Sequence, residues 1–99
     1  MNSKIYSVDE IKKRFGKVAG KYDIEQAFLF GSYARGEATK KSDVDICIKG
    51  GNMKTLFQFG GFYADIQDAM KKKIDVIDYD EMYSGFKKEA GREFVKIYG

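Results

Sequence analysis

The stretch FLFGSYARGEATKKSDVDICIKG, from Phe28 to Gly50, decides how the rest of the chain is interpreted. Its first residues are apolar and end at Gly-Ser, a pair that breaks a strand and opens a turn. Further on, apolar residues alternate with Asp43, Asp45 and Cys47, so the two kinds of side chain lie on opposite faces of a strand. Two aspartates one residue apart, in a strand that otherwise looks buried, call for a chemical explanation.

The bulk composition indicates a folded chain. Of its 99 residues, 43% are hydrophobic and 15% are aromatic, which predicts a single domain over residues 1–99 and argues against disorder. The net charge of +3 is too small to indicate nucleic-acid binding, and we expect none. No stretch approaches the ~18 continuous apolar residues of a membrane span, and the first ten residues lack the apolar segment of a signal peptide. The only cysteine, Cys47, fits a reducing cytoplasm.

The absence of histidine excludes several kinds of active site. Ser-His-Asp and Cys-His catalysis both need an imidazole, and the chain has none. One cysteine without histidine also makes a zinc site very improbable. Any chemistry must therefore use Asp, Glu, Lys, Arg, Ser and Tyr.

Helix and strand patterns alternate along the chain. SVDE, from Ser7 to Glu10, predicts a capping box at the start of a first helix. A second long helix is expected from about Lys54 to Lys72, and Gly60-Gly61 in its middle could kink or break it. This alternation predicts an α/β (α+β) fold, a small sheet covered by helices. The other expected elements are strands at 24–30, 42–49 and 73–79, a short helix at 32–37, a last helix that Asp80 caps and that carries Met82, Phe86 and Ala90, and an extended tail at 94–99.

The spacing of apolar residues also predicts which side chains face the core. In the second long helix the expected core stripe is Leu56, Phe59, Tyr63, Ile66 and Met70. Aromatic residues outside the stripes are candidates for a partner surface, namely Phe57, Phe62, Tyr83 and Tyr98. The lysine runs at 40–41 and 71–73 are interpreted as solvated loops and helix ends.

The aspartates suggest a metal site. Asp43 and Asp45 share one strand face about 6.5–7 Å apart, and Asp75 interrupts the later strand KIDVID in the same manner. If the two strands are neighbours, three carboxylates converge, whereas Asp78 faces the opposite way. Such charges repel by about 4 kcal/mol at ~4 Å and an effective dielectric near 20, so either a pKa rises or a cation binds. Oxygen ligands favour Mg²⁺ or Mn²⁺, and two such ions can assist phosphoryl-type transfer.

The Gly-Ser pair provides a complementary phosphate site. Gly31 lets the backbone turn sharply and a phosphate approach closely, and N–H groups at the start of the next helix attract anions. Ser32 adds a hydroxyl donor. Arg35, three residues further on, could contact a phosphate or form a structural ion pair. Either motif alone is usually structural, but the two together are far more specific.

The segment GSYARGEATKKSDVDICI, together with KIDVID and the ending EFVKIYG, resembles the minimal nucleotidyltransferase (MNT) family of the DNA polymerase β-like superfamily. The resemblance implies a polymerase β palm-like fold, a small mixed sheet flanked by helices. It also implies Mg²⁺-dependent transfer of AMP from ATP, with two ions and with pyrophosphate as the leaving group. Gly31 and Ser32 would contact the β- and γ-phosphates, Asp43 and Asp45 would hold the metals, and Asp75 would complete the metal site and help deprotonate the acceptor hydroxyl.

The resemblance further implies a partner. Many MNT proteins of this length resemble the antitoxin of a toxin–antitoxin pair, which adenylylates a tyrosine of a HEPN-domain toxin. Two alternatives stay open: transfer to a small hydroxylated molecule with the help of a partner subunit, and a non-catalytic antitoxin that inhibits by binding. The sequence does not fix the acceptor, the number of nucleotides transferred or the base, and it leaves a homo-oligomer open.

Overall fold

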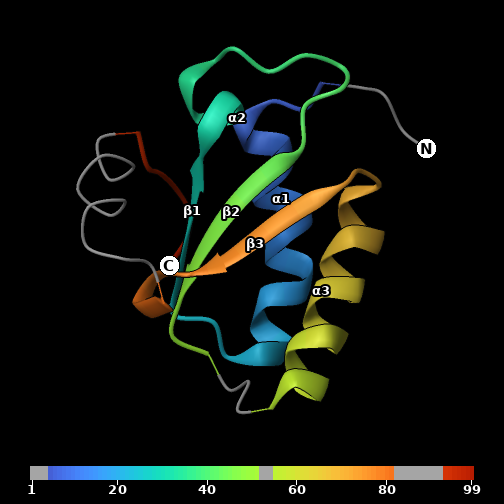
Figure 1. Ribbon diagram of the computed structural model, residues 1–99, viewed down its shortest axis with the longest axis vertical. Coiled ribbons are helices and arrows are strands. Elements are labelled where there is room, and N and C mark those ends of the chain that lie inside the picture. Colours follow the sequence, from blue (N-terminus) through green and yellow to red (C-terminus); the bar gives the residue numbers. More distant parts are fainter. Residues whose placement is uncertain (1–4, 52–54, 82–92) are drawn as a thin grey trace.

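The computed structural model describes residues 5–51, 55–81 and 93–99 of the chain. Within them, four strands form one mixed sheet in the order β3-β2-β1-β4 (Figure 1). Strands β2 and β3 run parallel, and β1 runs antiparallel to both β2 and β4. The predicted fold class, a small mixed sheet with helices, is confirmed. The elements are α1 (Val8–Ala19), η1 (Gly20–Tyr22), β1 (Gln26–Phe30), α2 (Gly31–Arg35), β2 (Val44–Lys49), α3 (Leu56–Met70), β3 (Ile74–Asp78), η2 (Tyr79–Glu81) and β4 (Val95–Tyr98).

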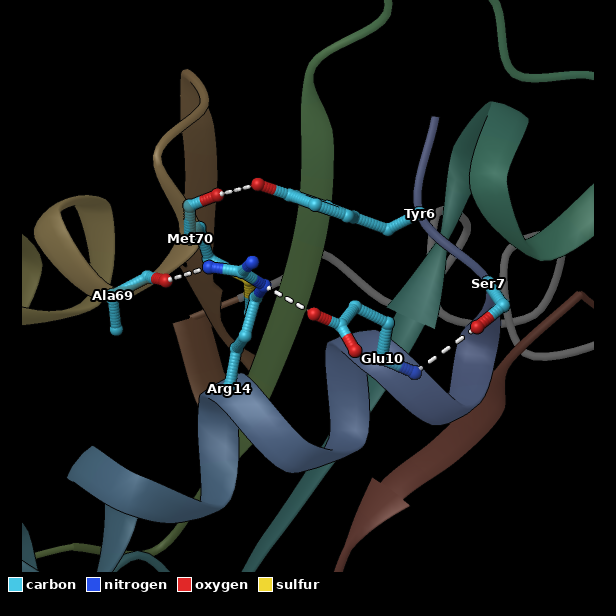
Figure 2. Close-up of polar contacts among 6 residues, drawn as sticks. All are labelled: Tyr6, Ser7, Glu10, Arg14, Ala69 and Met70. Atoms are coloured by element: carbon cyan, nitrogen blue, oxygen red, sulfur yellow. Dashed lines mark hydrogen bonds and ion pairs between the residues drawn. The ribbon is translucent and has the colours of Figure 1, made fainter. Parts of the chain in front are cut away.

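The helix starts follow from local sequence. The Ser7 side chain accepts a hydrogen bond from the Glu10 N–H at 3.1 Å, which confirms the predicted N-cap of α1. The Glu10 carboxylate, however, accepts from Arg14 Nε at 2.9 Å, so it does not complete the expected capping box with Ser7 (Figure 2). A full capping box does start α3, between Thr55 and Gln58, at a position where the sequence pattern did not lead us to expect one.

Both long helices pack on the same face of the sheet and against each other (Figure 1). Helix α3 is continuous from Leu56 to Met70, so the expected break at Gly60-Gly61 does not occur. Its core assignment needs correction, because Phe62 is fully buried whereas Leu56 is 91% exposed. The largest fully buried side chains between helices and sheet are Ile11, Phe15, Leu29, Val44, Ile46, Ile48, Phe62, Ile66, Met70 and Ile74.

The other candidates for a partner surface have separate outcomes. Phe57 is 91% exposed and keeps that interpretation. Tyr98 is half-buried and packs edge-on against Phe15, with ring centroids 5.9 Å apart, so it belongs to the core margin. Tyr83 and the helix expected after Asp80 lie outside the described residues. Before that gap, the last described element is the short 3-10 helix η2.

Polar contacts tie the start of α1 to the end of α3 (Figure 2). The Tyr6 hydroxyl donates to the carbonyl oxygen of Met70, and Arg14 Nη1 donates to that of Ala69 at 2.8 Å. The Arg14 guanidinium also lies 4.6 Å from the centroid of the Tyr6 ring. The last carbonyls of a helix lack partners within the helix, so these two side chains satisfy them and fix the point at which the chain turns into β3.

The opposite face of the sheet carries a smaller apolar cluster. Phe30 and Cys47 are buried there against Ile77, Tyr79 and Phe94. The Cys47 side chain is fully buried, consistent with a small core side chain. In the part of the chain that the structure describes, no helix has the length and apolarity to cross a membrane.

Candidate active site

The Gly-Ser turn and the Asp-x-Asp strand meet at one edge of the sheet. Strand β1 ends at Phe30, which pairs in register with Asp45 of β2, and Gly31 then opens the short helix α2 with a φ of +72°. A Cβ atom at Gly31 would lie 2.3 Å from Asp45 Oδ2. The carboxylate of Asp45 therefore lies directly against the glycine, and no other residue type fits there without a shift.

The third predicted carboxylate lies on the neighbouring strand. Strands β2 and β3 are parallel and adjacent, and Asp45 and Asp75 are register partners. The sequence pattern predicted that the carboxylates would converge if these two strands were neighbours. Asp43 stands just before β2. Asp78 pairs with Ile48 further along the strand, and its carboxylate accepts a hydrogen bond from the Asp80 N–H at 2.9 Å. Asp78 thus lies away from the aspartate pair.

Burial and the mutual repulsion of the three aspartates both affect the pKa of Asp45. Partial burial, followed by the negative charges of Asp75 and Asp43, raises the pKa of Asp45 to about 6, and the positive charge of Arg35 acts in the opposite direction. Asp75, by contrast, is exposed. The cluster is therefore a region of concentrated negative potential in which Asp43 and Asp45 are partly buried, as expected of a site that receives a cation.

The metal prediction needs a qualification. Across residues 5–51, 55–81 and 93–99, no group of three or more Cys, Asp or Glu side chains is arranged so that it could hold a metal ion by itself. That Asp43, Asp45 and Asp75 hold the metal together with bound phosphates stays a prediction. The donors are nevertheless of the right chemistry, because Mg²⁺ is usually held by one or two carboxylates together with substrate phosphates and water. The residues fit an ion shared with a polyphosphate rather than a protein-only cage.

Arg35 takes the structural alternative that the sequence left open. Its Nε lies 3.2 Å from Glu37 Oε1, and its Nη1 lies 3.2 Å from Glu93 Oε2. Glu93 was not identified from the sequence, because it is distant along the chain and only the fold brings it to α2. Since Arg35 lowers the pKa of Asp45, its charge acts on the carboxylate site even while it is paired.

The comparisons with known proteins agree with this geometry. The family model described as "Polymerase beta, Nucleotidyltransferase" matches residues 10–99. The chain belongs to this family. The prediction that the protein is a nucleotidyltransferase is thus confirmed at the level of the family.

One relative and two solved structures illustrate what the chain is similar to. Protein adenylyltransferase MntA of Thermococcus cleftensis is 30% identical over 88 residues, covering 89% of this chain and 82% of that protein. A toxin–antitoxin crystal structure with AMP-PNP has a TM-score of 0.75 at 17% identity, covering 89% of this chain and 73% of that one. A tri-AMPylated Shewanella oneidensis HEPN toxin in complex with an MNT antitoxin gives a TM-score of 0.62 at 14% identity, covering 90% and 72%. At these identities the solved structures establish the shared fold.

Proposed function

We propose that this protein transfers AMP from ATP to a tyrosine hydroxyl of a HEPN-domain toxin, and thereby acts as the antitoxin of that toxin in the cytoplasm. The observation that carries the proposal is the contact of Gly31 with Asp45, with Asp75 beside Asp45 in register. The adenylyltransferase named above and the solved toxin–antitoxin complexes support the choice of nucleotide and of partner.

Gly31 and Ser32 would receive the triphosphate. Gly31 has no side chain to obstruct a phosphate, and Ser32 is half-buried at the same turn with a hydroxyl to donate. Asp43 and Asp45 would hold Mg²⁺ together with the phosphates. When bound, Mg²⁺ (or Mn²⁺) would neutralise charge that develops on the phosphate oxygens and on the leaving pyrophosphate. Arg35 would contribute positive charge nearby if it left Glu37 or Glu93.

Asp75 would act on the acceptor. It is exposed next to Asp45, so a hydroxyl from another protein can approach it. The tyrosine oxygen attacks the α-phosphorus, the bond from that phosphorus to the β-phosphate oxygen breaks, and pyrophosphate leaves. Asp75 accepts the tyrosine proton as the new P–O bond forms.

An exposed apolar surface supports a protein partner. At the start of α3, Leu56 and Phe57 are each 91% exposed. Beside them lies an open groove of about 500 Å³, which apolar side chains of α3 and β3 line together with Asp78 and Glu81. Exposed apolar surface of this kind is typical of protein interfaces. We assign it to docking of the toxin.

The test uses labelled ATP, Mg²⁺ and the product of the neighbouring reading frame. Label should appear on a tyrosine of the partner with the wild-type protein and be absent with an Asp43→Ala/Asp45→Ala variant. Label only on an added small hydroxylated compound would favour a small-molecule transferase. Equal neutralisation of the toxin by the double variant would instead favour an antitoxin that acts by binding alone.

A further inference from the structure

We propose that Lys72 is a positioning residue for the active site: its ammonium group anchors the loop that carries Asp43. The inference rests on the proposed function in one respect, namely the role of Asp43 as a ligand of the metal–nucleotide complex. The anchor itself rests on the geometry of the chain alone.

Lys72 occupies an unusual position for a lysine. The sequence pattern predicts three solvated lysines at 71–73, and Lys71 and Lys73 are indeed exposed. Lys72 between them is only 4% exposed, which corrects that prediction. Lysine is rarely buried unless it is paired, yet among the described residues its ammonium forms no ion pair. The one hydrogen bond that its ammonium forms within the described residues is therefore of interest.

That partner is the backbone of the loop between α2 and β2. Lys72 Nζ donates to the carbonyl oxygen of Lys40 at 3.2 Å. The next residue contributes a second contact, because the Val44 N–H donates to the Lys73 carbonyl oxygen at 3.1 Å. Two consecutive residues after α3 therefore hold both ends of the segment 40–44, and Asp43 lies between the two contacts.

The loop is also braced internally. The Thr39 N–H donates to Ser42 Oγ at 2.8 Å, and the Ser42 N–H donates back to the Thr39 carbonyl oxygen at 3.1 Å. These bonds set the shape of the turn, and the Lys72 contact both fixes where it lies and limits how often it opens. Without that contact, repulsion among Asp43, Asp45 and Asp75 would favour movement of Asp43 away from the other two carboxylates.

The chain geometry after α3 explains how Lys72 reaches the loop. Lys71 ends the helix with a φ of +57°, and its N–H donates to the Gln67 carbonyl oxygen. This left-handed residue redirects the backbone from α3 toward β3. An apolar side chain at 72 could fill the same space, but it would leave the Lys40 carbonyl without its donor. The ammonium therefore contributes loop position, because its hydrogen bond joins residue 72 to the backbone of the loop.

The first experiment measures the anchor without nucleotide. In a Lys72→Met variant, amide exchange at Lys41 and Ser42 should become faster by on the order of tenfold, because a hydrogen bond from a charged donor is lost, while exchange in α1 and β1 stays unchanged. Lys73→Met, which removes an exposed ammonium and keeps the backbone contact, is the matched control and should change neither region. Unchanged exchange at Lys41 and Ser42 in Lys72→Met would overturn the proposal. Loss of protection throughout the chain would overturn it as well, since the ammonium would then support the whole fold.

The second experiment measures the consequence for the site. Binding of a non-hydrolysable ATP analogue to Lys72→Met should weaken by on the order of tenfold with Mg²⁺ present and stay unchanged in EDTA, whereas Lys73→Met binds as wild type in both. Faster loop exchange with unchanged Mg²⁺-dependent binding would overturn the positioning role. An Asp43→Asn variant separates the two hypotheses: if it too binds normally with Mg²⁺, the proposed role of Asp43 is wrong, and the exchange result still decides whether Lys72 is an anchor.

Discussion

Gly31 and Asp45 show how closely single residues are matched in this site. A Gly31→Ala variant introduces a Cβ 2.3 Å from Asp45 Oδ2 at a φ of +72°, so both the backbone and the carboxylate must shift. We expect a loss of about 1–3 kcal/mol in the free energy of unfolding and loss of ATP-analogue binding. Thermal unfolding and calorimetric titration measure the two effects.

Gly36 provides the matched control for this variant. It has nearly the same φ, +73°, but a Cβ there would meet nothing within 4 Å. Gly36→Ala should therefore cost only the backbone strain, about 1 kcal/mol, and should leave nucleotide binding intact. Equal loss of binding in both variants would show that the contact with Asp45 is not the cause.

Asp45 also makes stability depend on pH in the metal-free protein. Its folded-state pKa of about 6 lies above the ordinary value of 3.8, so protonation favours the folded state. This contribution is complete below pH 3.8 and is lost as the pH rises through 6. Asp45→Asn should therefore raise the free energy of unfolding at pH 8 by on the order of 1 kcal/mol after solvent screening, and the melting temperature with it, and should change both little at pH 4. The same substitution should abolish transfer, and a lower melting temperature at pH 8 would contradict this account.

Among the elements, the junction of α1 and α3 supports the strand that carries Asp75. Tyr6→Phe removes the donor to the Met70 carbonyl oxygen at the end of α3, which leaves a buried acceptor unpaired. We expect a loss of about 1–2 kcal/mol, measured by thermal unfolding. Tyr22→Phe is the control, because its hydroxyl bonds to Asp65 at the exposed surface, and it should change stability much less. A similar loss in both variants would mean that burial of the bond is not decisive.

The elements also show what sequence periodicity can predict. The alternation around Val44 and Ile46 correctly placed the apolar face of β2 against the core. In α3 the same reasoning chose Leu56 over Phe62. Neighbouring apolar residues at 56–57 and 62–63 fit more than one helical face, and Gly60 and Gly61 contribute no side chain to distinguish them. The burial of Phe62 is decided by where the sheet lies, which local spacing does not contain.

The site was predictable in part for the same reason. Asp43, Asp45 and Gly31 lie close together along the chain, so their local pattern is enough to indicate the chemistry. The position of Asp75 depended on a parallel pairing of β2 and β3, which the sequence offered only as a condition. Lys72 could not be recognised, because its burial results from the turn at Lys71 and from a loop 32 residues away.

At the scale of the whole molecule, the two long helices cover one face of the sheet (Figure 1), and Asp75 of β3 is exposed. In the proposed function, the acceptor tyrosine belongs to the partner toxin. Asp75 lies near the start of β3, and the three residues that follow it, Val76 to Asp78, line the groove together with Leu56. A partner that contacts both Asp75 and the groove must therefore extend along this strand. The single domain over residues 1–99 stays a prediction.

This arrangement separates docking from chemistry in a final test. A Leu56→Asp/Phe57→Asp variant should weaken binding of the HEPN toxin by about tenfold or more, because it places charges in an apolar contact. ATP-analogue binding should stay unchanged, since neither side chain belongs to the proposed nucleotide site. Stability should change little, because both positions are exposed. Ala64→Asp, at another exposed position of the same helix, is the control and should leave the complex intact. Calorimetry with the toxin and with the nucleotide analogue measures each affinity. Undiminished toxin binding by the double variant would place the interface elsewhere. Loss of nucleotide binding would show that the substitutions act on the nucleotide site itself.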